Sequence, residues 1–138
     1  ITHNSVTLHT GQQFAFPDAR RLASGAASGA PSIKNYPVQG MAGGCLVPLA
    51  MLSLHSALRH NGCKSIVINT VHDSIVLDVF PGEEALVARI TYDAMTGVTK
   101  AFEELYNVKW VVPLEVDVEV GKNWLDMDTF TLDYQQAM

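Results

Sequence analysis

The chain has 138 residues, of which 48% are apolar, and this is enough for a buried core in one domain or a large part of one. Nine basic residues against fourteen acidic ones give a formal net charge of -5, which argues against a protein that binds nucleic acid by charge alone. The two cysteines, Cys45 and Cys63, are far apart and form no C-x-x-C pair. They favour reduced thiols in a cytoplasmic protein over a disulfide framework or a zinc site.

The N-terminal part of the chain predicts a hairpin and then a loop. Residues 6–16, "VTLHTGQQFAF", contain two β-type runs around a Thr-Gly pair, which favours a hairpin turn. The stretch "DARRLASGAASGAPS" that follows is rich in Gly, Ala and Ser, a composition typical of loops. Arg20, Arg21 and Lys34 make its flanks basic.

A long helix is predicted from Pro37 to Asn61-Gly62, because apolar residues recur there at steps of three and four. Pro48 removes a backbone donor and is expected to bend this helix. The most apolar segment, residues 41–54, is shorter than the ~20 residues that a bilayer requires, and no secretory signal opens the chain. No membrane partner is therefore expected.

The remaining elements complete an α+β pattern. "KSIVINT" and "SIVLDVF" predict a second hairpin with His72-Asp73 at or beside its turn, and Pro81-Gly82 with two glutamates predicts a helix that runs to Tyr106-Asn107. Residues 113–121, "PLEVDVEVG", alternate apolar and acidic residues as a strand with one wet face does. We expect an antiparallel sheet of two hairpins and a final strand, covered by two long helices.

The His72-Asp73 pair has a structural and a chemical interpretation. An aspartate in a turn accepts nearby backbone amides, and this alone explains many such pairs. An exposed carboxylate also suits a hard cation such as Mg²⁺, but a two-ion catalytic site needs more acids, and none stands close in sequence. Asp78 lies five residues along the next strand and is expected to be distant and structural. Spacing alone leaves both interpretations open.

Three sequence motifs, taken in their order along the chain, add evidence that the spacing around His72-Asp73 does not provide. "IKNYPVQG", "VHDSIVLDV" and "PLEVDVEVGKNW" together resemble the C-terminal part of the palm of family A (DNA polymerase I-like) DNA polymerases, most closely those of bacteriophages. The resemblance runs from about Leu8 to Trp124, and "QFAFPD" is similar to the segment that leads from the fingers back to the palm. It implies a palm-type sheet, with residues 5–124 forming the C-terminal part of fingers and palm and residues 125–138 an acidic tail.

The resemblance implies roles for individual residues. Asp73 resembles the palm carboxylate that binds catalytic Mg²⁺, and His72 the residue beside it that contacts the primer terminus. Asn35 and Gln39 are similar to the polar pair that faces the minor groove of the primer-template duplex, with Lys34 as a neighbouring DNA contact; helix capping and surface amides are the alternative. The implied reaction is attack of the primer 3′-hydroxyl on the α-phosphate of a deoxynucleoside triphosphate.

The sequence also departs from the family pattern. Ser74 stands where many members have Glu, and Pro31 lies where many have Arg ahead of the "NYPVQ" motif. The strand with the second metal carboxylate and the fingers helix with its Lys and Tyr are absent from these residues. The chain alone is therefore expected to be inactive, with a complementary N-terminal polymerase fragment, primer-template DNA and deoxynucleoside triphosphates as partners.

The first residues, "ITHNS", resemble the end of an intein followed by the first residue of its C-extein. In that chemistry the Ser5 hydroxyl accepts the upstream polypeptide, Asn4 cyclises, and His3 assists. This hypothesis makes residues 1–4 an intein remnant and the remainder of the intein a further partner. The alternative is an ordinary polar stretch at a point where the sequence was cut.

Two rival functions remain at this stage. One is a metal-dependent phosphohydrolase that uses the His-Asp pair with His55 and His60, although their five-residue spacing does not place them on one helix face. The other is a non-catalytic domain whose apolar surface docks on another chain.

Overall fold

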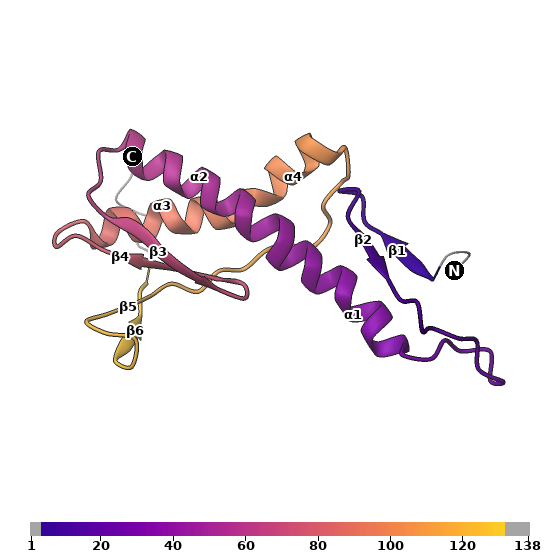
Figure 1. Ribbon diagram of the computed structural model, residues 1–138. Helices are drawn as coiled ribbons and strands as arrows, with labels where there is room; N and C mark the ends of the chain where they lie inside the picture. The colour runs from indigo at the N-terminus through magenta and orange to yellow at the C-terminus, as the bar shows by residue number, and fades with distance from the viewer. Residues whose placement is uncertain (1–3, 132–138) are drawn as a thin grey trace.

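A long helical rod forms the spine of the structure, a computed structural model that describes residues 4–131 (Figure 1). The rod consists of α1 (Ala30–Met41), a π-helical segment η1 (Ala42–Leu46) and α2 (Val47–His60). The prediction that the helix begins at Pro37 was wrong, because α1 already begins at Ala30. Pro31 lies in the first turn, where a missing backbone N–H is not needed, and Gly29 precedes it in the left-handed region at a φ of 69°.

The rod changes its helical form just before Pro48. A proline at this position cannot donate to the carbonyl of Gly44, and glycine is a poor helix former, so η1 lies where the α-helical pattern is weakest. The predicted bend at Pro48 stays a prediction; just before this residue the structure has the π-helical segment, and Figure 1 shows the rod continuing through it.

Both predicted hairpins are confirmed. Strands β1 (Ser5–Thr7) and β2 (Gln13–Ala15) pair antiparallel. Strands β3 (Ile66–Val71) and β4 (Ser74–Asp78) pair antiparallel across the His72-Asp73 turn, with an irregularity of register between Val67 and Asn69.

The second long helix is broken, which corrects the prediction of one helix up to Tyr106. It consists of α3 (Glu84–Thr96) and α4 (Val98–Tyr106), separated at Gly97. A side-chain carbon at Gly97 would stand 2.7 Å from the backbone oxygen of Asp93, so the chain turns here in a way that only glycine permits without a shift. The predicted end at Asn107 is confirmed, with that residue in the left-handed region at a φ of 53°.

The C-terminal part forms a third hairpin, from β5 (Glu119–Gly121) and β6 (Met127–Thr129). The strand predicted for residues 113–121 is therefore shorter than expected. Its alternation is nevertheless real up to residue 118, because Leu114, Val116 and Val118 are half-buried whereas Glu115 and Asp117 are exposed. Within residues 4–131 the strands form three separate two-stranded sheets, so the α+β class is confirmed but a single continuous sheet is not formed.

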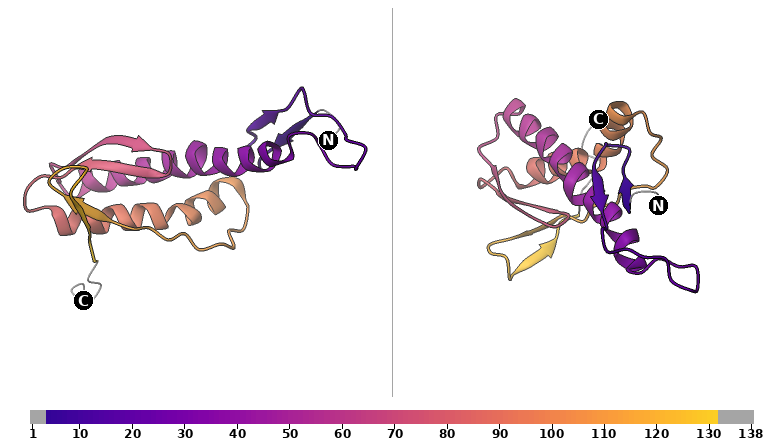
Figure 2. Two further views of the ribbon diagram at one scale, coloured as in Figure 1. Left: turned by 90° about the horizontal axis from the view of Figure 1, so that it is seen from below. Right: turned by 45° about the vertical axis from the view of Figure 1, so that its right-hand side comes forward.

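The core lies around the α2 half of the rod. Figure 2 shows α3, α4 and the β3–β4 hairpin running beside this half, whereas α1 and the first hairpin extend away from it. Two clusters of buried residues fill the space: Leu54, Leu58, Val87, Ile90 and Ala94 form one, and Leu46, Ala50, Val98 and Phe102 form the other. Ile75 of β4 packs against both, so the second hairpin is fixed to the core.

The rod is apolar enough to raise the question of a membrane. Residues Ala30–His60 have the length and composition of a membrane span, but a core helix of a soluble protein passes the same test. Leu54 at the centre of the core is fully buried. The expected absence of a membrane partner stays a prediction.

Candidate functional site

The tip of the β3–β4 hairpin presents His72 and Asp73 to solvent. Val71 and Ser74 close the strands, so the two residues form a two-residue turn, and the Ser74 hydroxyl donates to the Val71 carbonyl at 2.8 Å. His72 has a φ of 55°, a left-handed conformation that costs a non-glycine residue roughly 1 kcal/mol. Asp73 keeps a negative φ, and this combination is the φ pattern of a type II′ hairpin turn. The turn therefore holds a strained residue directly beside an exposed carboxylate.

The open end of the same hairpin is tied to the start of α3 by Glu83. Its carboxylate accepts hydrogen bonds from the backbone N–H groups of Lys64 and Ser65 at 3.0 Å, and from the Ser65 hydroxyl at 2.6 Å. The Ser65 oxygen in turn accepts from the backbone N–H of Phe80 at 2.9 Å. The hydrogen bond from Ser65, followed by that from Lys64, lowers the pKa of Glu83. The hairpin is thus anchored where β3 begins and β4 ends.

The sequence patterns did not predict this anchor. Glu83 and Glu84 were expected only to mark the start of a helix, and Glu84 fits that role, because its own backbone N–H and that of Gly82 lower its pKa. Glu83 instead accepts hydrogen bonds from the backbone N–H groups of Lys64 and Ser65, just before β3 begins. Sequence offers no signal for a contact between residues so far apart.

The predicted DNA-contacting residues lie on α1. Lys34, Asn35 and Gln39 are all exposed, and the four-residue step from Asn35 to Gln39 places these two amides on one face of the helix. Neither amide makes a side-chain hydrogen bond to any other residue within 4–131. Because α1 begins at Ala30 with Gly29 as its cap residue, the alternative of helix capping by Asn35 or Gln39 is excluded.

The hairpin tip meets the rod one turn beyond Gln39. A side-chain carbon built on Gly43 would stand 3.7 Å from the backbone oxygen of His72, so the turn lies directly against η1. Asn35, Gln39 and Gly43 each lie about one helical turn from the next. The structure therefore brings together the amide-bearing side of the rod and the His72-Asp73 turn, which are more than thirty residues apart in sequence.

A complete metal site is not formed by the described part of the chain. Within residues 4–131, no three His, Cys, Asp or Glu side chains lie close enough together to hold a metal ion. Asp78 pairs with Ile66 at the open end of the hairpin, away from Asp73. Asp73 can offer Mg²⁺ one exposed carboxylate, which is a suitable ligand type, but the other ligands must come from elsewhere.

The same finding bears on the phosphohydrolase alternative. His55 and His60 are exposed on α2, and in the described residues they do not form a metal cluster with the turn. A hydrolase of this kind requires several protein ligands around its metal. That alternative is not supported.

The predicted splicing residues are partly visible. His3 lies outside the described residues. Asn4 has a φ of 47° and donates through its side-chain nitrogen to the Ala19 carbonyl at 3.1 Å, and the Ser5 hydroxyl accepts from the Gln13 amide at 3.0 Å. Asn4 and Ser5 therefore also help to fix the first hairpin.

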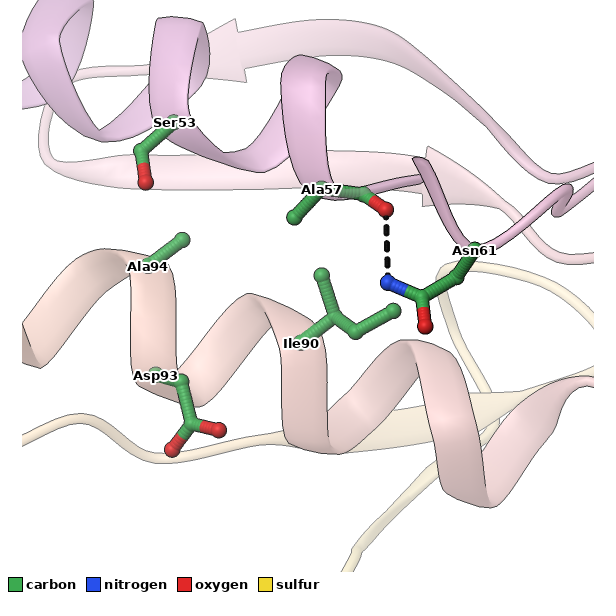
Figure 3. Close-up of a pocket in the computed structure, with 6 residues that line it drawn as sticks. All are labelled: Ser53, Ala57, Asn61, Ile90, Asp93 and Ala94. Atoms are coloured by element: carbon green, nitrogen blue, oxygen red, sulfur yellow. Dashed lines mark hydrogen bonds between the residues drawn. The ribbon is translucent and has the colours of Figure 1, made fainter. Parts of the chain in front are cut away.

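A solvent-open groove of about 290 Å³ lies between α2 and α3 (Figure 3). It is lined by small and apolar residues, with Asn61 donating to the Ala57 carbonyl at 2.8 Å across one end. Asp93 at its rim forms an ion pair with Arg89 at 3.8 Å. None of the predicted site residues lines this groove, and it adds no chemistry to the turn.

Comparison with known proteins defines the family. The sequence profile of DNA polymerase family A matches residues 3–126. The DNA polymerase I of Chloroflexus aurantiacus is 31% identical over 130 residues, which cover 94% of this chain and 13% of that protein. The DNA polymerase of Bacillus phage SP01 is 31% identical over 99 residues, or 72% of this chain and 10% of the phage protein.

A third relative, the thermostable DNA polymerase I of Thermus aquaticus, is 36% identical over 91 residues, which are 66% of this chain and 10% of that enzyme. No solved structure matches the chain. Because the family profile covers most of the chain, the chain belongs to DNA polymerase family A. It spans only about a tenth of the length of these relatives.

Proposed function

We propose that this chain is the C-terminal palm portion of a phage-type family A DNA polymerase and supplies one side of its active site. The observation that carries the proposal is the contact between the His72-Asp73 turn and the rod one turn beyond Gln39. A polymerase must hold the primer end next to its metal ligands, and this contact puts the proposed duplex-binding side chains and the proposed metal ligand on adjoining surfaces. The similarity to a Bacillus phage polymerase supports the phage type.

Asp73 is proposed as a Mg²⁺ ligand. When bound, Mg²⁺ would neutralise charge on the reacting phosphate and lower the pKa of the attacking hydroxyl. The exposed carboxylate on a braced turn suits this task, because a ligand must be held firmly while remaining open to its metal. Ser74 cannot replace the charge of a glutamate. Its hydroxyl instead donates to the Val71 carbonyl and closes the turn.

The other residues bind and orient the nucleic acid. The His72 imidazole is proposed to donate to the primer terminus, and the amides of Asn35 and Gln39 to donate to minor-groove acceptors that all base pairs share. Lys34 is proposed to bind a phosphate. These contacts would hold the primer end without selecting a sequence, as a polymerase requires.

The proposed partners are a complementary polymerase fragment, primer-template DNA and deoxynucleoside triphosphates. A complementary fragment would provide the second metal carboxylate and the fingers that grip the nucleotide. Uncovered apolar side chains support such docking: Val38 and Leu52 on the rod are 63% and 68% exposed, and only 28% of the rod's apolar window is buried within the chain. Cytoplasmic location is part of the same proposal.

The test is primer extension by the chain combined with a complementary fragment that carries the remaining family A motifs. Asp73→Ala is expected to abolish nucleotide incorporation, whereas Asp78→Ala, on the same hairpin but distant from the tip, is expected to retain it. Full extension by the Asp73→Ala complex would reject the assignment and favour the non-catalytic docking domain.

The intein hypothesis remains a separate proposal, supported only by the order His3-Asn4-Ser5. Its test is mass spectrometry of the chain expressed with its natural upstream sequence. A ligated product that disappears in an Asn4→Ala variant would support splicing, and an unprocessed polypeptide would oppose it.

A further inference from the structure

Three glycines interrupt the middle of the rod, where each costs about 1 kcal/mol of helix stability relative to alanine. They are Gly40 at the end of α1 and the adjacent Gly43 and Gly44 in η1. Glycine at three nearby helix positions therefore calls for an explanation at each position. The explanation lies in the atoms that a side-chain carbon would meet there.

Two of the glycines face the first hairpin. A side-chain carbon on Gly40 would collide with the ring of Phe14, which occupies that space. One on Gly44 would stand 3.6 Å from the side-chain oxygen of Gln12. Gly43 differs, because a side-chain carbon there would meet, outside its own helix and within residues 4–131, the backbone oxygen of His72 and no other atom within 4 Å. It is the glycine that faces the proposed catalytic turn.

We propose that Gly43 is a positioning residue, which sets how closely the His72-Asp73 turn approaches the rod. This inference rests on the proposed function of Asp73 and deepens it. The π-helical form of η1 directs the bare backbone of Gly43 at the turn, and no side chain separates the two. The depth of this approach fixes the position of Asp73 relative to Gln39, and hence relative to a bound primer end.

The geometry predicts a sharp dependence on side-chain size at this position. At 3.7 Å a single methyl group makes ordinary contact with the His72 oxygen, so Gly43→Ala fits without a shift. The branched carbons of valine extend beyond a carbon that already touches the turn, and valine is stiff in a helix. Gly43→Val therefore has to displace the turn. Misplacement of reacting groups by about 1 Å can cost about 10²-fold in rate.

Comparison of the two variants separates helix propensity from the position of the turn. Valine and alanine are both at least as good helix formers as glycine, so helix propensity lowers the thermal midpoint of neither variant, and any loss in Gly43→Val comes from displacing the turn. Gly43→Val is expected to reduce kcat of the reconstituted polymerase by about 10-fold or more and to change KM for the nucleotide by less than about 2-fold. Gly43→Ala is expected to keep kcat.

The matched control is Gly44→Val, the same change one residue later. It meets only the flexible end of Gln12, which can move aside, so kcat is expected to stay at its parental value. Equal kcat values for Gly43→Val and Gly44→Val would overturn the inference. If Asp73→Ala is inactive in the same complex, that result leaves the proposed function intact and removes only the role of Gly43.

A second measurement covers the case in which Gly43→Val loses stability. The amide resonances of His72, Asp73 and Ser74 are compared between the parental chain and the Gly43→Ala and Gly44→Ala variants, in the complex with only this chain labelled. In Gly43→Ala the new methyl group contacts the His72 oxygen, so the inference predicts a change in the chemical shifts of the turn amides without a displacement of the turn. In Gly44→Ala these chemical shifts are expected to stay unchanged. Unchanged turn resonances in Gly43→Ala would overturn it.

Discussion

The two halves of the helical rod differ in what they contact. The α2 half supplies Ala50, Leu54 and Leu58 to the core, whereas α1 contains no residue that is buried. The α1 half nevertheless carries the three residues proposed to contact the duplex beside the primer end, Lys34, Asn35 and Gln39. The comparison indicates that one half of the rod stabilises the chain, and that the other half is available for molecules outside it.

The largest expected effect contrasts the core beside the α2 half with the exposed α1 half, by replacing one aromatic side chain with alanine in each. Phe102 of α4 is 1% exposed and packs against Tyr106 and Trp110, so Phe102→Ala is expected to cost about 3–5 kcal/mol of unfolding free energy. Tyr36 of α1 is 52% exposed and its ring packs on that of Phe16, so Tyr36→Ala is expected to cost at most about 1 kcal/mol. Urea unfolding measures both. Similar costs would show that α1 is as much a part of the core as α4.

A smaller effect tests how the first hairpin is attached to α1. The Phe14 ring fills the space where a side chain at Gly40 would lie, so Gly40→Ala is expected to be overpacked by about 1–3 kcal/mol. Phe14→Ala should relieve the clash, and the double variant is then more stable than the sum of the single changes predicts. A coupling energy near zero in this double-mutant cycle would mean that the ring does not pack on Gly40.

The smallest effect concerns the anchored end of the second hairpin and depends on pH. Hydrogen bonds from Ser65 and Lys64 lower the pKa of Glu83. Ionised Glu83 therefore stabilises the native state relative to the unfolded chain. This contribution is present above the unfolded pKa of a glutamate and is lost as pH falls through the lowered native pKa. Glu83→Gln is expected to reduce the thermal midpoint at pH 7 and to approach the parental midpoint below about pH 4. A difference that is constant with pH would contradict this role.

Local patterns in the sequence predicted several of these features correctly. The two-residue turn at His72-Asp73 follows from β-branched runs on both sides, and the end of α4 at Asn107 follows from a residue that tolerates a positive φ. The alternation also predicted correctly that Leu114, Val116 and Val118 are more buried than the acidic residues between them. In each case the signal and the structure lie within a few residues of each other.

The features that were missed depend on distant contacts. Gly97 breaks the second helix although the apolar spacing continues through it, because spacing does not report the backbone crowding near Asp93. The Glu83 anchor and the approach of Gly43 to His72 join segments that only the fold brings together. A single sheet was expected from two hairpin signals and a final strand, but pairing between these elements depends on strand edges that sequence periodicity does not define.

The most direct test of the account locates the tip of the second hairpin on a primer. A photoreactive benzophenone residue is placed at position 72 in one complex and at position 78 in another, with the complementary fragment and a primer-template bound. Position 72 lies in the turn at the tip of the hairpin and position 78 at the far end of β4, roughly 16–20 Å apart along the strand. The account predicts a cross-link from position 72 to the primer 3′ end and little from position 78. An equal or stronger cross-link from position 78 would contradict the placement of the turn at the site of nucleotide addition.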